Sequence, residues 1–122
     1  MRSVLVDTCV WVKHFRLRNE HLMALLVDGE VLSHPLVVGE LAMGCLRDRH
    51  RTLWDLSRLG RPPIATDAET LQMVEARRLW GRGIQWNDAN ILASTVISGA
   101  LLWTTDARLA KIAAECGVAY NG

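Results

Sequence analysis

Four acidic residues of this sequence stand where side chains are usually buried or where chemistry is expected. Asp7 and Asp106 each follow a short apolar run of the kind that forms a buried strand. Glu40 interrupts an apolar helical pattern and shares a face with apolar neighbours, while Asp88 stands at the start of another apolar pattern. Carboxylates in such places are typical of acid–base catalysis or of metal binding.

The elements that must position these residues are short apolar strands alternating with helical patterns. Such alternation is typical of an α/β fold with a mostly parallel sheet of four to five short strands flanked by helices. Strands are predicted at residues 3–6, 30–33, 101–104 and 118–120, with a weak one at 64–65. Helices are predicted at residues 10–15, 20–27, 35–46, 49–59, 67–80, 88–98 and 107–116.

The topology of a parallel sheet brings the four carboxylates together. Parallel strands end at one edge of the sheet, and the connecting helices begin at that edge and run back. Asp7 and Asp106 end strands, while Glu40 and Asp88 lie in the first turns of helices, so all four are expected at the edge where α/β sheets bind ligands. Singly, each could be a helix cap, a turn residue or a surface glutamate. Their coincidence favours one site.

A cluster of four carboxylates needs compensation for its charge. Two carboxylates about 5 Å apart repel by roughly 3 kcal/mol at an effective dielectric constant near 20. Either some of them are protonated, or a cation lies among them. Ligands that are all oxygen atoms favour Mg²⁺ or Mn²⁺ over zinc, and such an ion suits the hydrolysis of phosphodiesters.

Length, composition and cysteine usage limit the class of protein. A chain of 122 residues, 50% hydrophobic and 22% charged, is expected to form a single domain over residues 1–122. Three cysteines without close spacing argue against a disulfide framework and for a reducing compartment. Residues 4–6 are too short for a signal-peptide core, and no stretch is long enough for a membrane span. We therefore expect a cytoplasmic protein that does not contact a membrane.

The remaining charge favours a polyanionic substrate. The chain has 14 basic and 13 acidic residues, and because four of the acidic ones are the candidate ligands, the rest of the chain carries a net charge of +5. Most of the basic residues are arginine, whose planar fork suits phosphate. Lys13, Arg16 and Arg18 lie just beyond Asp7 and are candidates for contacts with a nucleic-acid backbone, although a solvated helix face is the ordinary role of such residues.

Four segments, in this order and at this spacing, resemble the motifs of PIN-domain ribonucleases, and in particular those of VapC-type toxins from bacterial type II toxin–antitoxin systems. The segments are VDTCVWV at 6–12, ELAMG at 40–44, DANILAS at 88–94 and LWTTD at 102–106. The resemblance covers nearly the whole chain and implies a PIN-like three-layer fold. Cys9 departs from the family pattern, in which a serine or asparagine is more usual, and Asn90 stands where an apolar residue or histidine is expected.

The resemblance also implies a function and its residues. It implies a metal-dependent endoribonuclease toxin that arrests translation, forms a homodimer, and is neutralised by a cognate VapB-like antitoxin that docks in an apolar groove and blocks the pocket. The implied residues are catalytic Asp7, Glu40, Asp88 and Asp106, with Mg²⁺ or Mn²⁺ held by Asp7, Asp88 and Asp106 and polar support from Thr104 and Thr8.

Two other functions fit parts of the pattern. A phosphatase of the haloacid dehalogenase type also has an aspartate after its first strand, but it needs a second aspartate two residues later, where this chain has Cys9. A catalytically silent PIN-like module that only binds a partner or nucleic acid would keep the fold without turnover. Ser-His-Asp and Cys-His hydrolysis are not indicated, because no histidine lies near a serine or cysteine motif.

Overall fold

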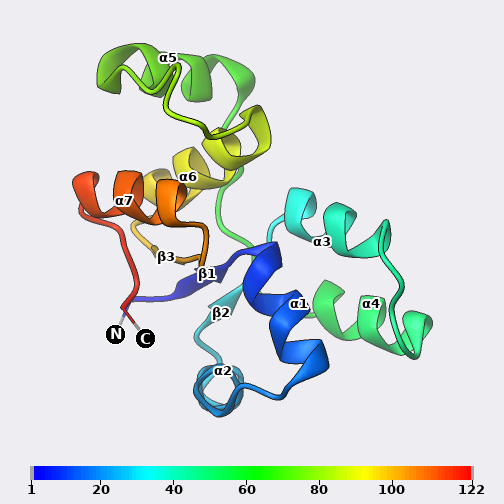
Figure 1. Ribbon diagram of the computed structural model, residues 1–122. Helices are drawn as coiled ribbons and strands as arrows, with labels where there is room; N and C mark the ends of the chain where they lie inside the picture. The colour runs from blue at the N-terminus through cyan, green and yellow to red at the C-terminus, as the bar shows by residue number, and fades with distance from the viewer. Residues whose placement is uncertain (1, 122) are drawn as a thin grey trace.

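The computed structural model describes residues 2–121 and has a central sheet of three short parallel strands (Figure 1). The strands are β1 (Val4–Val6), β2 (Val31–Leu32) and β3 (Leu101–Trp103), arranged in the order β2-β1-β3. Val4 pairs with Val31 on one side and with Leu101 on the other. Because β1 is the middle strand, its three apolar side chains are completely buried, and the residue that follows it emerges at the centre of the sheet's edge.

Helices cover both faces of the sheet and give the expected three layers. Figure 1 shows α6 and α7 on one face and α2 on the other, with α5 beyond α6. Helix α1 packs against α3, and α3 packs against α4. The helices of residues 2–121 are α1 (Thr8–Arg16), α2 (Glu20–Val27), α3 (Pro35–Ala42), α4 (Arg49–Ser57), α5 (Asp67–Arg77), α6 (Trp86–Ser98) and α7 (Ala107–Glu115).

The outer edges of the sheet differ from the sequence prediction. No strand forms at residues 64–65; instead Gly60 makes a single parallel bridge with Leu32. Pro62 and Pro63 follow it, and because proline has no N–H group the chain cannot extend this ladder. At the other edge, the predicted strand 118–120 is reduced to one bridge between Ala119 and Leu102. The α/β fold class is confirmed, with three strands extended by two bridges.

Three helices have bounds that matter for the site. Helix α6 begins at Trp86, two residues before the predicted start at Asp88. Helix α3 ends at Ala42 rather than at residue 46, so residues 43–48 form a loop. Helix α5 ends at Arg77 instead of residue 80, because Arg78 adopts the left-handed conformation with φ 54° and stops the helix.

Helix α6 is the most deeply buried helix and fixes the position of its own first turn. Every residue from 89 to 95 is buried. Asn90, the unexpected polar residue of this stretch, accepts a hydrogen bond from the Thr70 hydroxyl at 2.9 Å and donates one to the Trp86 carbonyl oxygen at 2.9 Å. Asn90 therefore ties α5 to α6.

Within residues 2–121, no helix is both long and apolar enough to cross a membrane.

Candidate active site

Asp7 lies at the centre of the carboxyl edge of the sheet. It follows β1, caps the N-terminus of α1 and is only 7% exposed. Its Oδ1 accepts a hydrogen bond from the Thr8 N–H at 2.8 Å, and its Oδ2 accepts one from the Thr104 hydroxyl at 2.8 Å. The Cys9 thiol lies 3.6 Å from Oδ2. These donors hold the buried carboxylate in one orientation. One of them is the thiol of Cys9, at the position where the family resemblance suggested a serine or asparagine.

Glu40 reaches the same edge from α3. The Thr8 hydroxyl, at the start of α1, donates a hydrogen bond to Glu40 Oε1 at 3.3 Å. Since α1 packs against α3, this contact joins the helix that follows Asp7 to the helix that carries Glu40. Thr8 thus supports two of the four carboxylates, one through its backbone N–H and one through its hydroxyl.

Asp88 occupies the first turn of α6 rather than its cap. Because α6 begins at Trp86, Gln85 is the N-cap residue and Asp88 is the third helical residue. The Gln85 N–H donates to Asp88 Oδ2 at 2.9 Å, which is the backbone half of a capping box. The predicted cap role is therefore shifted by one turn, and Asp88 remains at the sheet edge with its carboxylate half-buried.

Asp106 caps α7 and is tied to Asp7 through Thr104. Its Oδ1 accepts hydrogen bonds from the N–H groups of Arg108 and Leu109 at 2.9 and 3.1 Å. Its own N–H donates to the Thr104 hydroxyl oxygen at 3.1 Å, and that hydroxyl donates to Asp7. Asp106 is thus the N-cap residue of α7, the alternative considered in the sequence analysis. The hydrogen bonds of this cap also hold its side chain in place.

Electrostatics show that the four carboxylates share one environment. Burial raises the pKa of Glu40 above its usual value; the hydrogen bond from Thr8 opposes this, and the charges of Asp7 and Asp88 raise the pKa further. Burial likewise raises the pKa of Asp88, the Gln85 N–H opposes it, and the charges of Asp7 and Asp106 add to the increase. Asp7 and Asp88 thus lie within electrostatic reach of Glu40, and Asp7 and Asp106 within reach of Asp88, so the four predicted acidic residues form one cluster, called the acidic pocket below.

The pocket has suitable ligands for a hard cation but does not present them already assembled. Among residues 2–121, no three Asp, Glu, His or Cys side chains are grouped so that they could hold a metal ion as they stand. Each carboxylate is instead held by the hydrogen bonds described above, which for Asp7 and Glu40 include one from another element. Within the described chain, Glu40 Oε2, Asp88 Oδ1 and Asp106 Oδ2 accept no hydrogen bond. An all-oxygen set with available acceptors, in which the pKa values of Glu40 and Asp88 are raised, fits Mg²⁺ or Mn²⁺.

The predicted substrate-binding residues of α1 do not gather around this pocket. Lys13 and Arg16 are exposed on α1, and Arg16 lines a groove that also contains Glu40. Arg18 lies in the loop after α1, and its Nε atom is 3.2 Å from Oε1 of Glu20, the first residue of α2, with which it forms an exposed ion pair. Of the three, Arg16 has the most direct relation to the site.

Sequence reasoning missed two residues beside the pocket, Arg108 and Trp86. Arg108 lies two residues after Asp106 and packs over Gly83, and Trp86 lies two residues before Asp88 with 43% of its surface exposed. Their closeness in sequence to candidate ligands was the available signal. Arg108 was counted as part of a solvated basic surface, and the late predicted start of α6 left Trp86 in a loop.

Comparison with known proteins gives two findings. The chain matches the PIN domain family over residues 4–115. It is also 47% identical over 117 residues to Ribonuclease VapC32 of Mycobacterium tuberculosis, in strain CDC 1551 / Oshkosh and in strain ATCC 25618 / H37Rv. In both cases the aligned region covers 95% of this chain and 94% of the relative.

Proposed function

The chain belongs to the PIN-domain family and is a ribonuclease of the VapC type, and from this premise we propose that it is a single-domain, metal-dependent endoribonuclease toxin acting in the cytoplasm. The observation that carries the proposal is the convergence of Asp7, Glu40, Asp88 and Asp106 at the carboxyl edge of one sheet. Four different elements supply these residues, and the charges of their neighbours raise the pKa values of Glu40 and Asp88.

Asp7, Asp88 and Asp106 are the residues proposed to hold Mg²⁺ or Mn²⁺. When bound, such an ion lowers the pKa of a water molecule and neutralises charge on a phosphoryl oxygen. Thr104 orients two of these ligands, because its hydroxyl donates to Asp7 and accepts from the Asp106 N–H. The protein therefore fixes the backbone positions of the ligands and leaves free oxygen atoms on Asp88 and Asp106.

Glu40 is the residue proposed to accept a proton from the attacking water. Its carboxyl group has a raised pKa because of burial, which makes its ionised form a stronger base than an ordinary glutamate. The Thr8 hydroxyl holds Oε1 and leaves Oε2 available in the described structure. Glu40 thus differs from the other three residues in its task, since it moves a proton rather than holding the cation.

The proposal is tested by incubating purified, antitoxin-free protein with transfer, ribosomal and messenger RNAs. Cleavage is expected with Mg²⁺ or Mn²⁺, and it should stop on addition of EDTA and return when the metal is restored in excess. Cleavage that EDTA leaves unchanged would contradict the metal-dependent mechanism. A well-folded protein that cuts none of these RNAs would favour the silent binding module.

A groove beside Glu40 is the proposed docking site of a VapB-like antitoxin. The groove has a volume of about 810 Å³ and lies between α1, α3, the 43–48 loop and α4. Apolar side chains such as Val12 and Phe15 line it, together with Arg16 and Arg47. Glu40 and Asp48 line it as well, so a mainly apolar segment with an acidic side chain toward Arg16 or Arg47 fits this lining. Because Glu40 is part of the lining, the occupant would lie against the acidic pocket.

A smaller cavity beside this groove supports a peptide-like partner. The cavity has a volume of about 200 Å³ and shares Phe15 and Thr52 with the groove. Trp11, which lines it, is 4% exposed, and its buried Nε1–H donates to no acceptor within the described residues. The cavity therefore extends the lining of the groove, with Trp11 and Phe15 in its wall.

The antitoxin proposal is tested by inhibition of RNA cleavage. Phe15→Ser is expected to weaken inhibition by the cognate antitoxin at least about tenfold, because it removes an apolar side chain from the groove. Val27→Ser, at the exposed C-terminal end of α2 and outside the groove, is the matched control. Equal inhibition of both variants would place the antitoxin elsewhere.

Expression of the active protein should also stop translation in cells, and antitoxin co-expression should restore it.

A homodimer is proposed on the basis of exposed apolar surface. Trp54, Leu71 and Trp80 are all more than half exposed, which is unusual for large apolar side chains unless a partner covers them. The molar mass of the purified protein, measured by light scattering, should be twice that of one chain. A monomeric mass at all concentrations would contradict the dimer.

A further inference from the structure

Arg108 connects the two elements that present Asp88 and Asp106. Its backbone N–H donates to Asp106 Oδ1 at 2.9 Å, at the start of α7. Its side chain lies against Gly83, in the loop that leads into α6: a Cβ atom added at Gly83 would lie 2.6 Å from Arg108 Cδ and 2.8 Å from Nη1. Gly83 stands two residues before Gln85, whose N–H holds Asp88. The Arg108 side chain therefore packs against the loop that leads to Asp88, while its backbone supports Asp106.

The guanidinium group of Arg108 has no acidic partner within the described structure. Among residues 2–121 it takes part in no ion pair, whereas Arg82 in the same region forms two hydrogen bonds of 2.7 Å with Glu115. An exposed arginine without an ion pair, two residues after Asp106, is suited to a ligand that carries negative charge itself. Arginine offers paired donors that match two phosphate oxygens.

Trp86 places an open aromatic ring on the same side of the pocket. It is the first residue of α6, and 43% of its surface is exposed. Its backbone is held by the hydrogen bond from Asn90 Nδ2, and Asn90 is itself fixed by Thr70. The indole is thus attached to a rigid support while its surface is available. Unpaired nucleic-acid bases stack on aromatic side chains of this kind.

We propose that Arg108 and Trp86 form an RNA-binding rim on the α6–α7 side of the acidic pocket, where Arg108 binds a phosphate of the RNA and Trp86 stacks on an unpaired base. The inference rests on the proposed ribonuclease function, because it names residues that would bind the RNA chain whose phosphodiester bond is cleaved in the pocket.

The rim is tested by RNA binding measured apart from cleavage. The full chain carrying Asp7→Asn is titrated into a fluorescein-labelled single-stranded RNA of random sequence, and fluorescence anisotropy gives the affinity over a series of KCl concentrations. Adding Arg108→Gln is expected to weaken binding about tenfold and to reduce the slope of log K against log salt by about 0.7, the value for one lost phosphate contact on a single strand.

Trp86 is expected to act differently from Arg108 in the same measurement. Trp86→Ala should weaken binding about tenfold with an unchanged salt slope, since stacking does not release counterions. Trp86→Phe should restore most of the affinity. If Trp86→Ala changed the oligomeric state and left RNA affinity unchanged, the residue would belong to a protein interface and the rim would be wrong.

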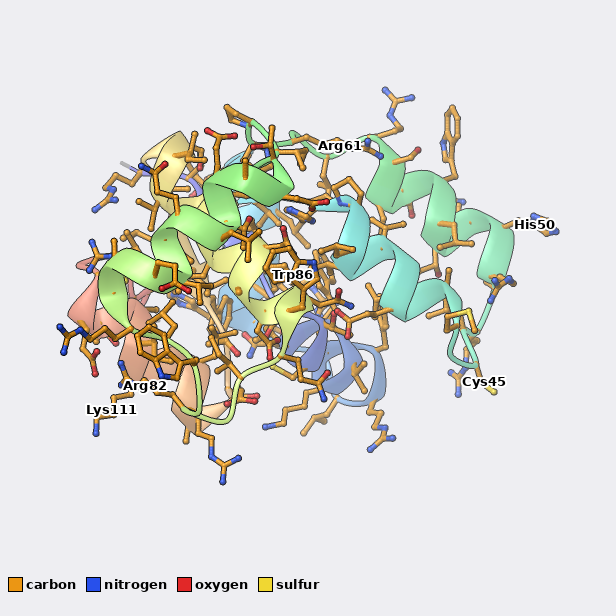
Figure 2. All side chains as sticks on the ribbon, turned by 90° about the horizontal axis from the view of Figure 1, so that it is seen from above. Cys45, His50, Arg61, Arg82, Trp86 and Lys111 are labelled. Carbon is orange, nitrogen blue, oxygen red and sulfur yellow. The ribbon has the colours of Figure 1, made fainter. Side chains whose placement is uncertain are left out.

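Lys111→Gln is the matched control for charge. Lys111 stands one turn further along α7, and Figure 2 shows it beside Arg82 on the side of the molecule away from Trp86. This variant should bind as the parent does, and thermal unfolding should show that all variants are folded. Equal binding by Arg108→Gln and Lys111→Gln, or a parent that binds no more tightly than Arg108→Gln, would overturn the rim. Wild-type cleavage is assayed in parallel, so that loss of the rim and loss of nuclease function are separate results.

Discussion

At the scale of single residues, Asp7 depends most on its neighbours. It is buried and accepts hydrogen bonds from Thr8 and Thr104, with the Cys9 thiol also in contact. Asp106, by contrast, is exposed and is held by the first turn of α7. The precision of the pocket therefore rests on Thr104, which contacts both residues.

Thr104→Val is expected to lower RNA cleavage about tenfold and to destabilise the fold by about 1–2 kcal/mol, because the variant keeps the shape of the side chain but leaves Asp7 Oδ2 without its hydroxyl donor. The measurements are single-turnover cleavage and urea unfolding. Thr104→Ser retains the hydroxyl and should keep most of both properties. Full activity in the valine variant would show that Asp7 needs no such support.

Glu40 and Asp88 predict how stability depends on pH. Their pKa values are raised in the folded state, chiefly by burial, so folding favours their protonated forms. Their contribution to stability is therefore present at low pH and is lost as the pH rises from the ordinary carboxyl range through the raised values. Glu40→Gln should be more stable than the wild type by about 0.5 kcal/mol at neutral pH, and the difference should vanish in acid.

Urea unfolding at neutral and acidic pH measures this difference. Glu75→Gln, at an exposed position of α5, is the control and should show little change at either pH. A wild-type protein that is more stable than Glu40→Gln at neutral pH would mean that Glu40 is stabilised by its surroundings, contrary to the direction of its pKa. Cleavage by the wild type should also fall in acid as Glu40 and Asp88 take up protons.

The sequence was informative about these four residues and less so about their surroundings. An acidic residue after an apolar strand is easy to find, and parallel topology then predicts its edge. The hydrogen bond that Asp88 accepts depends on where α6 begins, and the sequence pattern predicts a start at Asp88, two residues after the true start at Trp86. Asn90 looked like a departure in a functional motif, but its contacts with Thr70 and Trp86 are structural. Such pairings depend on tertiary packing.

At the scale of elements, the loop between α5 and α6 has a defined conformation. Gly81 and Gly83 both have positive φ angles, 72° and 86°, but only Gly83 lies against another side chain. An alanine at Gly81 meets backbone strain alone, whereas one at Gly83 meets the same strain and the Arg108 side chain. Comparing alanine variants at the two glycines therefore separates the free-energy cost of backbone strain from that of the contact with Arg108.

Gly83→Ala is expected to lower the free energy of unfolding by about 1.5 kcal/mol and Gly81→Ala by about 1 kcal/mol, the extra loss being small because the end of the Arg108 side chain can shift. The additional loss at Gly83 should disappear when Arg108→Ala is introduced as well, since the clash is then removed. Thermal or urea unfolding of the single and double variants measures both effects. Equal losses at Gly81 and Gly83 would contradict the packing of Arg108 over Gly83.

Strand and helix positions were predicted well where the apolar pattern was continuous. The strands at 4–6 and 101–103 and the helix at 20–27 were found within one residue. The outer strand was misplaced at 64–65 because the apolar residues there were given more weight than Pro62 and Pro63. The end of α5 was missed because it depends on the left-handed conformation of Arg78, which is uncommon for arginine.

At the scale of the whole molecule, negative charge gathers at one edge of the sheet and the rest of the chain carries a net positive charge. The chain as a whole has a net charge of +1, and most of its cations are arginine. The predicted resemblance to PIN-domain ribonucleases is confirmed by the family match over residues 4–115 and by the identity with Ribonuclease VapC32. The groove next to Glu40 could not be predicted, because it arises from the packing of α1, α3 and α4.

The measurement that tests the account most directly compares single-turnover RNA cleavage in Mn²⁺ by the wild type, Asp7→Asn and Asp28→Asn. Asp28 is an exposed residue after α2, so its variant removes the same charge outside the pocket. We predict that Asp7→Asn lowers the rate by at least about 100-fold and remains folded, while Asp28→Asn cleaves as the wild type does. A folded Asp7→Asn protein that cuts RNA at the wild-type rate would contradict the assignment of the acidic pocket as the catalytic site.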